Sequence, residues 1–214
     1  MSQHYQTTHS QDSDVFASLE GVQLDPYTLR RIFLLLTRNH FADPNYFGEV
    51  PDSFKHFTYR DGSSSPVKIE LDFTFDPEKS EQDTAIYIGV SDIQSSDSGV
   101  LNQFAGLNED FSGREFTNTD TCQVILTHVA PTADEALILG IISKAFFQGI
   151  RTLLQERLCV RAYQVAKLTR PTPAQPNTAD PFYRSDLILN LIINNDWTTS
   201  IESHRIKRVS FDLS

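Results

Sequence analysis

The sequence predicts an α+β domain in which two main helices flank a mixed, mostly antiparallel sheet, with long loops and a flexible N-terminal arm. The chain has 214 residues, which is enough for one sizeable core and too few for two. Many of its apolar residues are aromatic, with 15 Phe and 7 Tyr, and aromatic residues are favoured in strands. Apolar residues recur with a period of two in some segments and of about 3.6 in others, so both strands and helices are expected.

The first residues of the chain differ from the rest in composition. Residues 1–21 are rich in Gln, Ser, Thr and His, and the first basic residue of the chain is Arg30. A secretory signal needs a basic start and an apolar core, which this segment lacks. We therefore expect 1–21 to be a flexible polar arm and 22–214 to be a single domain. The longest nearly apolar run, 136–142, is far too short to span a membrane.

The first helix is expected directly after the arm. Asp25 is a suitable N-cap, and Pro26 suits the first helical position. Asp43–Pro44 marks an end shortly beyond the apolar positions. Those positions fall at helical spacing: Leu29, Ile32, Phe33 and Leu36.

Three strands are expected next, over 54–60, 67–75 and 85–90. The second is the clearest, because Val, Ile, Leu and Phe alternate in it with Lys, Glu, Asp and Thr. One of its faces is therefore expected to be buried and the other to be wet and acidic.

A long acidic insertion follows at about 91–119. Between Glu70 and Asp120 the chain has 12 acidic and 2 basic residues, a net charge of −10 that equals the net charge of the whole chain. A solvated loop explains such a block. A surface that must not adhere to a passing polyanion explains it as well. The isolated rings within the insertion indicate that it packs on its own domain or on a neighbour.

The second half of the chain is expected to hold a strand at 122–129, a long helix and three further strands. Thr132 and Glu135 match a capping box, and the helix is expected over 133–157. The last strands are expected at 159–168, 186–194 and 206–213, with Trp197 near the turn between the final two.

The helix at 133–157 is apolar around more of its circumference than one packed face requires. Packing of the first helix over it is one explanation, and a neighbouring subunit is the other. If a subunit covers it, the expected contact residues lie on this helix and in the acidic insertion: Ile138, Ile141, Phe147, Phe104 and Phe111.

No catalytic motif is recognisable, because the chain lacks a nucleophile elbow, a metalloprotease helix, a Walker loop and a dinucleotide fingerprint. The six His and two Cys show no zinc-ligand spacing, and we expect Cys122 and Cys159 to be buried free thiols. The carboxylates Glu70, Asp72 and Asp76 keep a metal-dependent nuclease open as a less favoured alternative. We expect no catalytic activity, no metal and no cofactor.

The order of these elements resembles the tail terminator and neck proteins of long-tailed bacteriophages. The resemblance is one of pattern and covers most of residues 22–213. It is carried by the strands Val67–Phe75 and Ala85–Val90, by Val124–Val129 followed by Thr132, Glu135 and the long helix, and by the closing strands with Trp197.

The resemblance implies a non-enzymatic virion protein that forms a ring, commonly a hexamer, at the head-proximal end of a phage tail. Such a ring caps the tail tube and joins it to the neck. The implied partners are further copies of the chain, the tail tube protein, the tail sheath, and neck or connector proteins. The implied location is the virion, after assembly in the host cytoplasm. Another phage neck or connector adaptor and a soluble oligomeric binding protein remain alternatives.

In such a ring, the acidic block is expected to line or rim the central passage. Like charges repel DNA, with screening over about 8 Å at physiological salt, so DNA slides through without specific binding. The residues expected to face the passage are Asp92, Asp97, Glu109 and Asp110.

Overall fold

The computed structural model describes residues 24–43, 57–62, 65–74, 84–91, 93–95, 103–107, 113–158, 160–174 and 182–200. Within these ranges, only the backbone is described at 74, 95, 103–107, 113–118 and 194–200.

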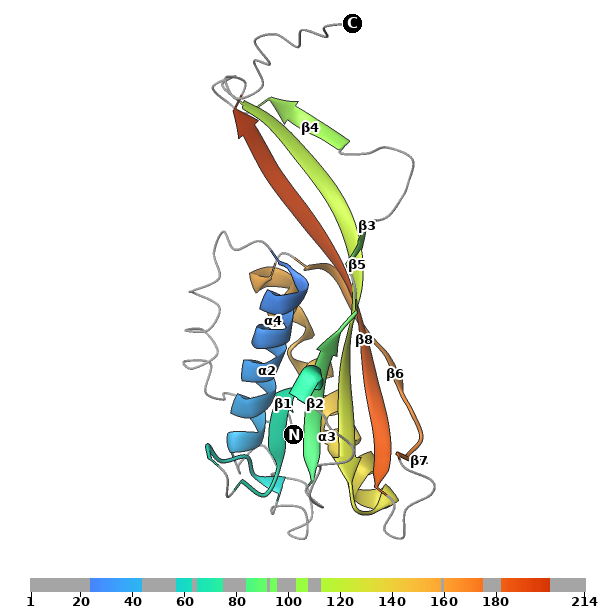
Figure 1. Cartoon of the computed structure of the whole chain (residues 1–214). Helices are drawn as coiled ribbons and strands as arrows, with labels where there is room; N and C mark the ends of the chain where they lie inside the picture. The colour runs from blue at the N-terminus through green and yellow to red at the C-terminus, as the bar shows by residue number, and fades with distance from the viewer. Residues whose placement is uncertain are drawn as a thin grey trace, which may run out of the picture.

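One mixed sheet organises the described chain and confirms the predicted α+β class (Figure 1). The strand order is β1 (Lys68–Leu71), β2 (Ala85–Val90), β5 (Gly113–Ala130), β8 (Tyr183–Ser200) and β6 (Val160–Leu168). Among the described strands, only β1 and β2 pair in parallel. Three short strands pair beside this path: β3 (Gln94–Ser95) and β4 (Gln103–Leu107) on β5, and β7 (Thr172–Pro173) on β8.

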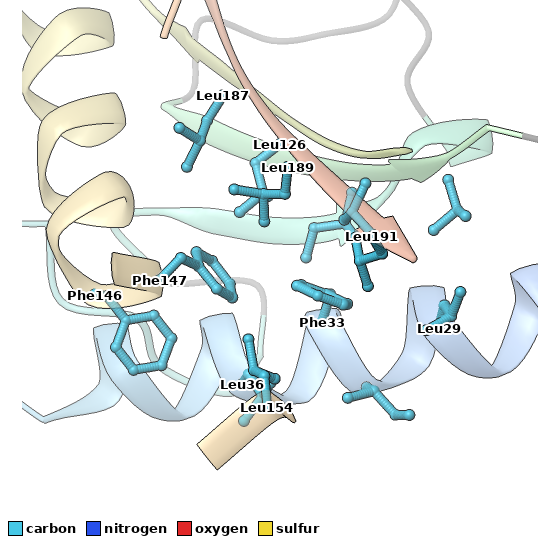
Figure 2. Packing of buried hydrophobic residues seen from close by; sticks show 14 of the residues in the cluster. Leu29, Phe33, Leu36, Leu126, Phe146, Phe147, Leu154, Leu187, Leu189 and Leu191 are labelled. Atoms are coloured by element: carbon cyan, nitrogen blue, oxygen red, sulfur yellow. The ribbon is translucent and has the colours of Figure 1, made fainter. Parts of the chain in front are cut away.

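The helices α2 (Pro26–Ala42), α3 (Ala133–Gly149) and α4 (Arg151–Arg157) cover one face of the sheet. Alternate residues from Cys122 to Ala130 of β5 and from Ser185 to Ile193 of β8 point to that face and are buried, because side chains alternate along a strand. Figure 2 shows four sheet leucines over α2, with rings of α2 and α3 turned into the same space. These leucines are Leu126, Leu187, Leu189 and Leu191.

The helix α2 begins where the sequence predicts. Asp25 is its N-cap, and its Oδ1 accepts the Thr28 amide at 2.7 Å. Arginine side chains then tie the helix to the sheet. Arg38 donates from Nε and Nη2 to the carbonyl oxygen of Ile69, at 3.0 and 2.8 Å. The position of α2 over β1 is therefore fixed by polar contacts as well as by its apolar stripe.

The helix α3 begins at the predicted capping box, where Thr132 Oγ1 accepts the Glu135 amide at 3.2 Å. It lies very close to the sheet at Gly140. A Cβ built there would lie 2.6 Å from Cδ1 of Leu168 and 3.5 Å from Oγ of Ser185. Glycine permits this approach because it has no side chain.

The prediction of one helix over 133–157 is wrong at its end. The axis bends by 54° between α3 and α4. Ile150 closes α3 by donating its amide to the Phe146 carbonyl at 3.0 Å, and the glycine before it weakens the helix there. Among the described helices, none alone is long and apolar enough to cross a membrane, whereas α3 and α4 taken together across their bend meet that length and composition.

Two of the three early strands also differ from prediction. The strand predicted at 67–75 stops at Leu71, because Asp72–Thr74 turns into a 3-10 helix, and Phe73 is 69% exposed. A Cβ at Gly89 would lie 2.6 Å from the Asp72 carboxylate, so this turn folds closely over β2. Within the predicted strand 54–60, the described residues 57–60 form no strand. The Tyr59 amide instead bonds the Phe41 carbonyl of α2 at 2.8 Å.

The largest difference concerns β5 and β8, which are each 18 residues long instead of the predicted eight or nine. The insertion predicted as irregular at 91–119 contains β3, β4 and the first residues of β5. Trp197 lies within β8 opposite Phe116 and therefore not in a turn, while residues 201–205 and the strand predicted at 206–213 lie outside the described residues. The strands predicted at 85–90 and 159–168 are confirmed as β2 and β6.

Candidate functional site

The ribbon formed by β5 and β8 is the most unusual surface of the described chain. The two strands pair without interruption from Gly113–Ser200 to Ala130–Tyr183. Pairing of β2 with β5 ends at Val124, and pairing of β6 with β8 ends at Ile193. Beyond these points the ribbon continues away from the helices, with β4 beside β5 (Figure 1). Seven residues of β8 project in this way, a length of about 20 Å.

The two long edges of the projecting ribbon are unlike. On the β5 side, β3 and β4 add further strands. On the outer side of β8, no described strand pairs beyond Ile193. An uncovered strand edge presents backbone N–H and C=O groups that can pair with another chain. The ribbon therefore offers a place where a partner strand fits.

The sequence carries a signal for this extension. Thr117, Thr119 and Thr121 alternate with Asn118 and Asp120, which is a strand period carried by a β-branched polar residue. The strand prediction depends on alternating apolar residues, and Phe116 is the one large apolar residue between Gly113 and Asp120.

The predicted contact residues on α3 divide into two groups. Phe147 is fully buried, with its ring 5.4 Å from Phe33 and 4.9 Å from Phe146. Its assignment to a subunit interface is therefore wrong, because the first helix of the same subunit covers it. Ile138 is half-buried against the core, and Ile141 is 50% exposed on the outer face of the helix.

The structure describes the side chains of none of the other predicted site residues. Phe104 belongs to β4, where only its backbone is described, paired with Phe116. Phe111 lies outside the described residues. The same holds for all four residues predicted to face a passage: Asp92, Asp97, Glu109 and Asp110.

A buried polar pair joins α3 to the sheet. Nδ1 of His128 lies 3.1 Å from the Ser185 carbonyl, so that nitrogen carries the proton, and Nε2 then accepts the Ser143 hydroxyl at 2.9 Å. A serine donating to a histidine is also the arrangement of a nucleophile and its base. Both side chains are completely buried, so the contact serves to hold α3 on β5 and β8.

Burial lowers the pKa of His128 to about 4. The Ser185 carbonyl and the charge of Asp186 act in the opposite direction and are outweighed. Burial likewise lowers the pKa of His40 to about 3, against a raising effect of Asp43. The His40 ring stacks on Phe146 with 4.1 Å between ring centroids. Neutral histidines thus contact α3 at Ser143 and at Phe146.

Potential metal ligands are not gathered in the described part of the chain, where no group of three or more His, Cys, Asp or Glu side chains is placed to hold an ion. Of the carboxylates considered for a nuclease, Asp72 lies 3.7 Å from Arg30, and Asp76 is outside the described residues. Cys122 is a buried free thiol whose pKa is raised to about 11, mainly by burial.

Tyr163 carries a buried hydroxyl without a hydrogen-bond partner among the described residues. Burial raises the pKa of this phenol. Because an unsatisfied buried hydroxyl is costly, Tyr163→Phe is expected to raise the free energy of unfolding by about 1 kcal/mol. Urea unfolding measures this. The control is Tyr59→Phe, which removes a hydroxyl that donates to Asp61 at 2.8 Å and should not stabilise the protein. Equal effects of the two changes would contradict the assignment.

Comparison of the sequence with protein-family models and with curated proteins finds no match.

Proposed function

We propose that the protein is a non-enzymatic structural subunit of a phage virion. In this proposal it forms a hexameric ring at the head-proximal end of the tail, which caps the tail tube and joins it to the neck or connector. The observation that carries the proposal is the projecting β5–β8 ribbon, in which no described strand pairs with the outer side of β8 beyond Ile193. A ribbon of so few strands is marginally stable by itself in water. Pairing with a strand of another chain would therefore stabilise it.

The unlike edges of the ribbon favour a ring over a two-fold dimer. If the outer edge of β8 in one subunit pairs with the outer edge of β4 in the next, each contact joins two different surfaces. Contacts of this heterologous kind form closed rings when the rotation between subunits closes. The ribbons then form a continuous sheet around a central passage.

The acidic residues of the chain fit the same arrangement. Asp97 lies in sequence between β3 and β4, and Glu109 and Asp110 lie between β4 and β5. Strands that belong to the ribbon therefore flank them. In the proposed ring these carboxylates rim the passage and keep DNA from adhering. The remaining partners are the tail tube protein and the tail sheath, and the location is the virion.

Single proline substitutions in the projecting part of β8 test whether its outer edge makes the contact. The N–H groups of neighbouring strand residues point to opposite sides, so one of Thr198 and Thr199 donates toward β5 and the other toward the uncovered edge. Of Thr198→Pro and Thr199→Pro, the variant that keeps the wild-type melting temperature is expected to lose assembly. Sedimentation velocity and thermal melts measure both properties. Unchanged assembly in both variants would contradict the edge contact.

A further inference from the structure

The outer face of α2 carries a short stripe of an aromatic, a basic and an aliphatic residue. Tyr27, Arg31 and Leu35 follow one another at a spacing of four, so they lie on one side of the helix. Tyr27 is 58% exposed and Leu35 is 40% exposed. The guanidinium carbon of Arg31 lies 5.8 Å from the centroid of the Tyr27 ring. We call these three residues the α2 stripe.

Arg31 differs from the other two arginines of α2 in what it contacts. Arg30 donates to the Val90 carbonyl at 3.1 Å and lies near Asp72, and Arg38 is bound to β1. Arg31 is exposed, and no described carboxylate forms an ion pair with it. The guanidinium N–H groups of Arg31 are therefore available to a partner. Tyr and Arg are also the residue types that often contribute most of the binding energy in protein interfaces.

The charge of the chain indicates which partner fits. The helix α2 contains three Arg and no Asp or Glu, in a chain of net charge −10. The densest acidic segment is 76–83, with four acidic residues and one Lys, and it joins the 3-10 helix after β1 to β2. The α2 stripe stays exposed within the subunit, so the acidic segment of another copy is available to cover it.

We propose that the α2 stripe of one subunit binds the acidic segment 76–83 of a second copy. This inference rests on the proposed ring and names a second contact within it. The contact again joins unlike surfaces, as a ring requires. An exposed ion pair alone contributes little, so the Tyr27 ring and the Leu35 side chain must be buried with it.

Charge reversal at Arg31 is the first part of the test. Arg31→Glu in the full chain is expected to raise the protein concentration at half-assembly about tenfold or more, because it places like charges together in a buried contact. The matched control is Arg60→Glu, which reverses an exposed charge in a loop and should leave that concentration unchanged. Sedimentation velocity at several salt concentrations measures both variants.

A charge exchange between subunits is the decisive part. A second variant combines Asp76→Lys, Glu78→Lys and Glu81→Lys. At the concentration at which wild type is half-assembled, this variant and Arg31→Glu should each stay largely unassembled alone, whereas an equal mixture should form rings in which the two variants alternate.

Three outcomes would overturn the inference while leaving the ring intact. The first is normal assembly of Arg31→Glu. The second is an equal mixture of the two variants that does not assemble although wild type does. The third is an Arg31→Glu subunit that unfolds instead of staying folded and unassembled. Weakened duplex DNA binding by Arg31→Glu with normal rings would assign the stripe to nucleic acid instead. A wild-type chain that forms no ring would count against the proposed function itself.

Discussion

Replacing Phe147 by Asp is expected to unfold the subunit. The side chain is fully buried between α2, α3 and the sheet, with Phe33 as a ring neighbour. Truncating a buried Phe costs about 3–5 kcal/mol, and an unpaired buried carboxylate adds a desolvation cost. Since whole domains are stable by only about 5–15 kcal/mol, most of the folded population should be lost. Circular dichroism and urea unfolding measure the effect.

Ile141→Asp is the matched control for this change. It places the same charge on the same helix, but on an outer face where Ile141 is already 50% exposed. Its free energy of unfolding should therefore stay within about 0.5 kcal/mol of wild type. A folded Phe147→Asp subunit with normal urea sensitivity would contradict the burial of Phe147 against α2 and the sheet.

Acidification from pH 7 to pH 5 is expected to destabilise the protein strongly. His128 and His40 have lowered pKa values in the folded state, about 4 and about 3, against 6.5 for an exposed histidine. Below pH 6.5 the unfolded chain therefore binds protons that the folded chain does not. Burial of the two neutral histidine rings stabilises the folded state fully above pH 6.5. This stabilisation is lost as pH falls from 6.5 toward the pKa values of the folded state. Each histidine should contribute about 2 kcal/mol of loss between pH 7 and 5.

Urea unfolding at pH 8, 7, 6 and 5 measures this dependence, in a range above the usual pKa values of Asp and Glu. His128→Asn removes one titrating ring while retaining an amide that can donate to the Ser185 carbonyl. This variant should be less stable than wild type at pH 8, because the bond to Ser143 is lost, and should lose about half as much stability on acidification. A wild-type midpoint that stays constant from pH 7 to 5 would contradict the burial of both rings.

The parts of the fold that follow from local chemistry were predictable from the sequence. The start of α2 at Pro26 and the start of α3 after Thr132 depend on caps that each satisfy a helix amide within three residues. The strand β2 is buried at every position, and its continuous apolar run predicts that. These signals depend on neighbours in sequence and need no knowledge of the tertiary structure.

The parts that depend on distant partners could not be predicted in the same way. The polar residues from Gly113 to Asp120 become a strand because β8 and β4 pair with them, and context of this kind outweighs intrinsic strand preference. The excess apolar surface of α3 had two explanations in the sequence. The contact between Phe33 and Phe147 shows that α2 of the same subunit covers part of this apolar surface of α3. Ile141, in contrast, remains 50% exposed.

The central claim, assembly into a ring, is tested most directly by the mass of the wild-type chain in solution combined with negative-stain images of the same sample. The proposal predicts particles of six subunits, each of 24.2 kDa, that show a central hole. A single subunit at every concentration tested, or a two-subunit particle without a hole, would contradict it.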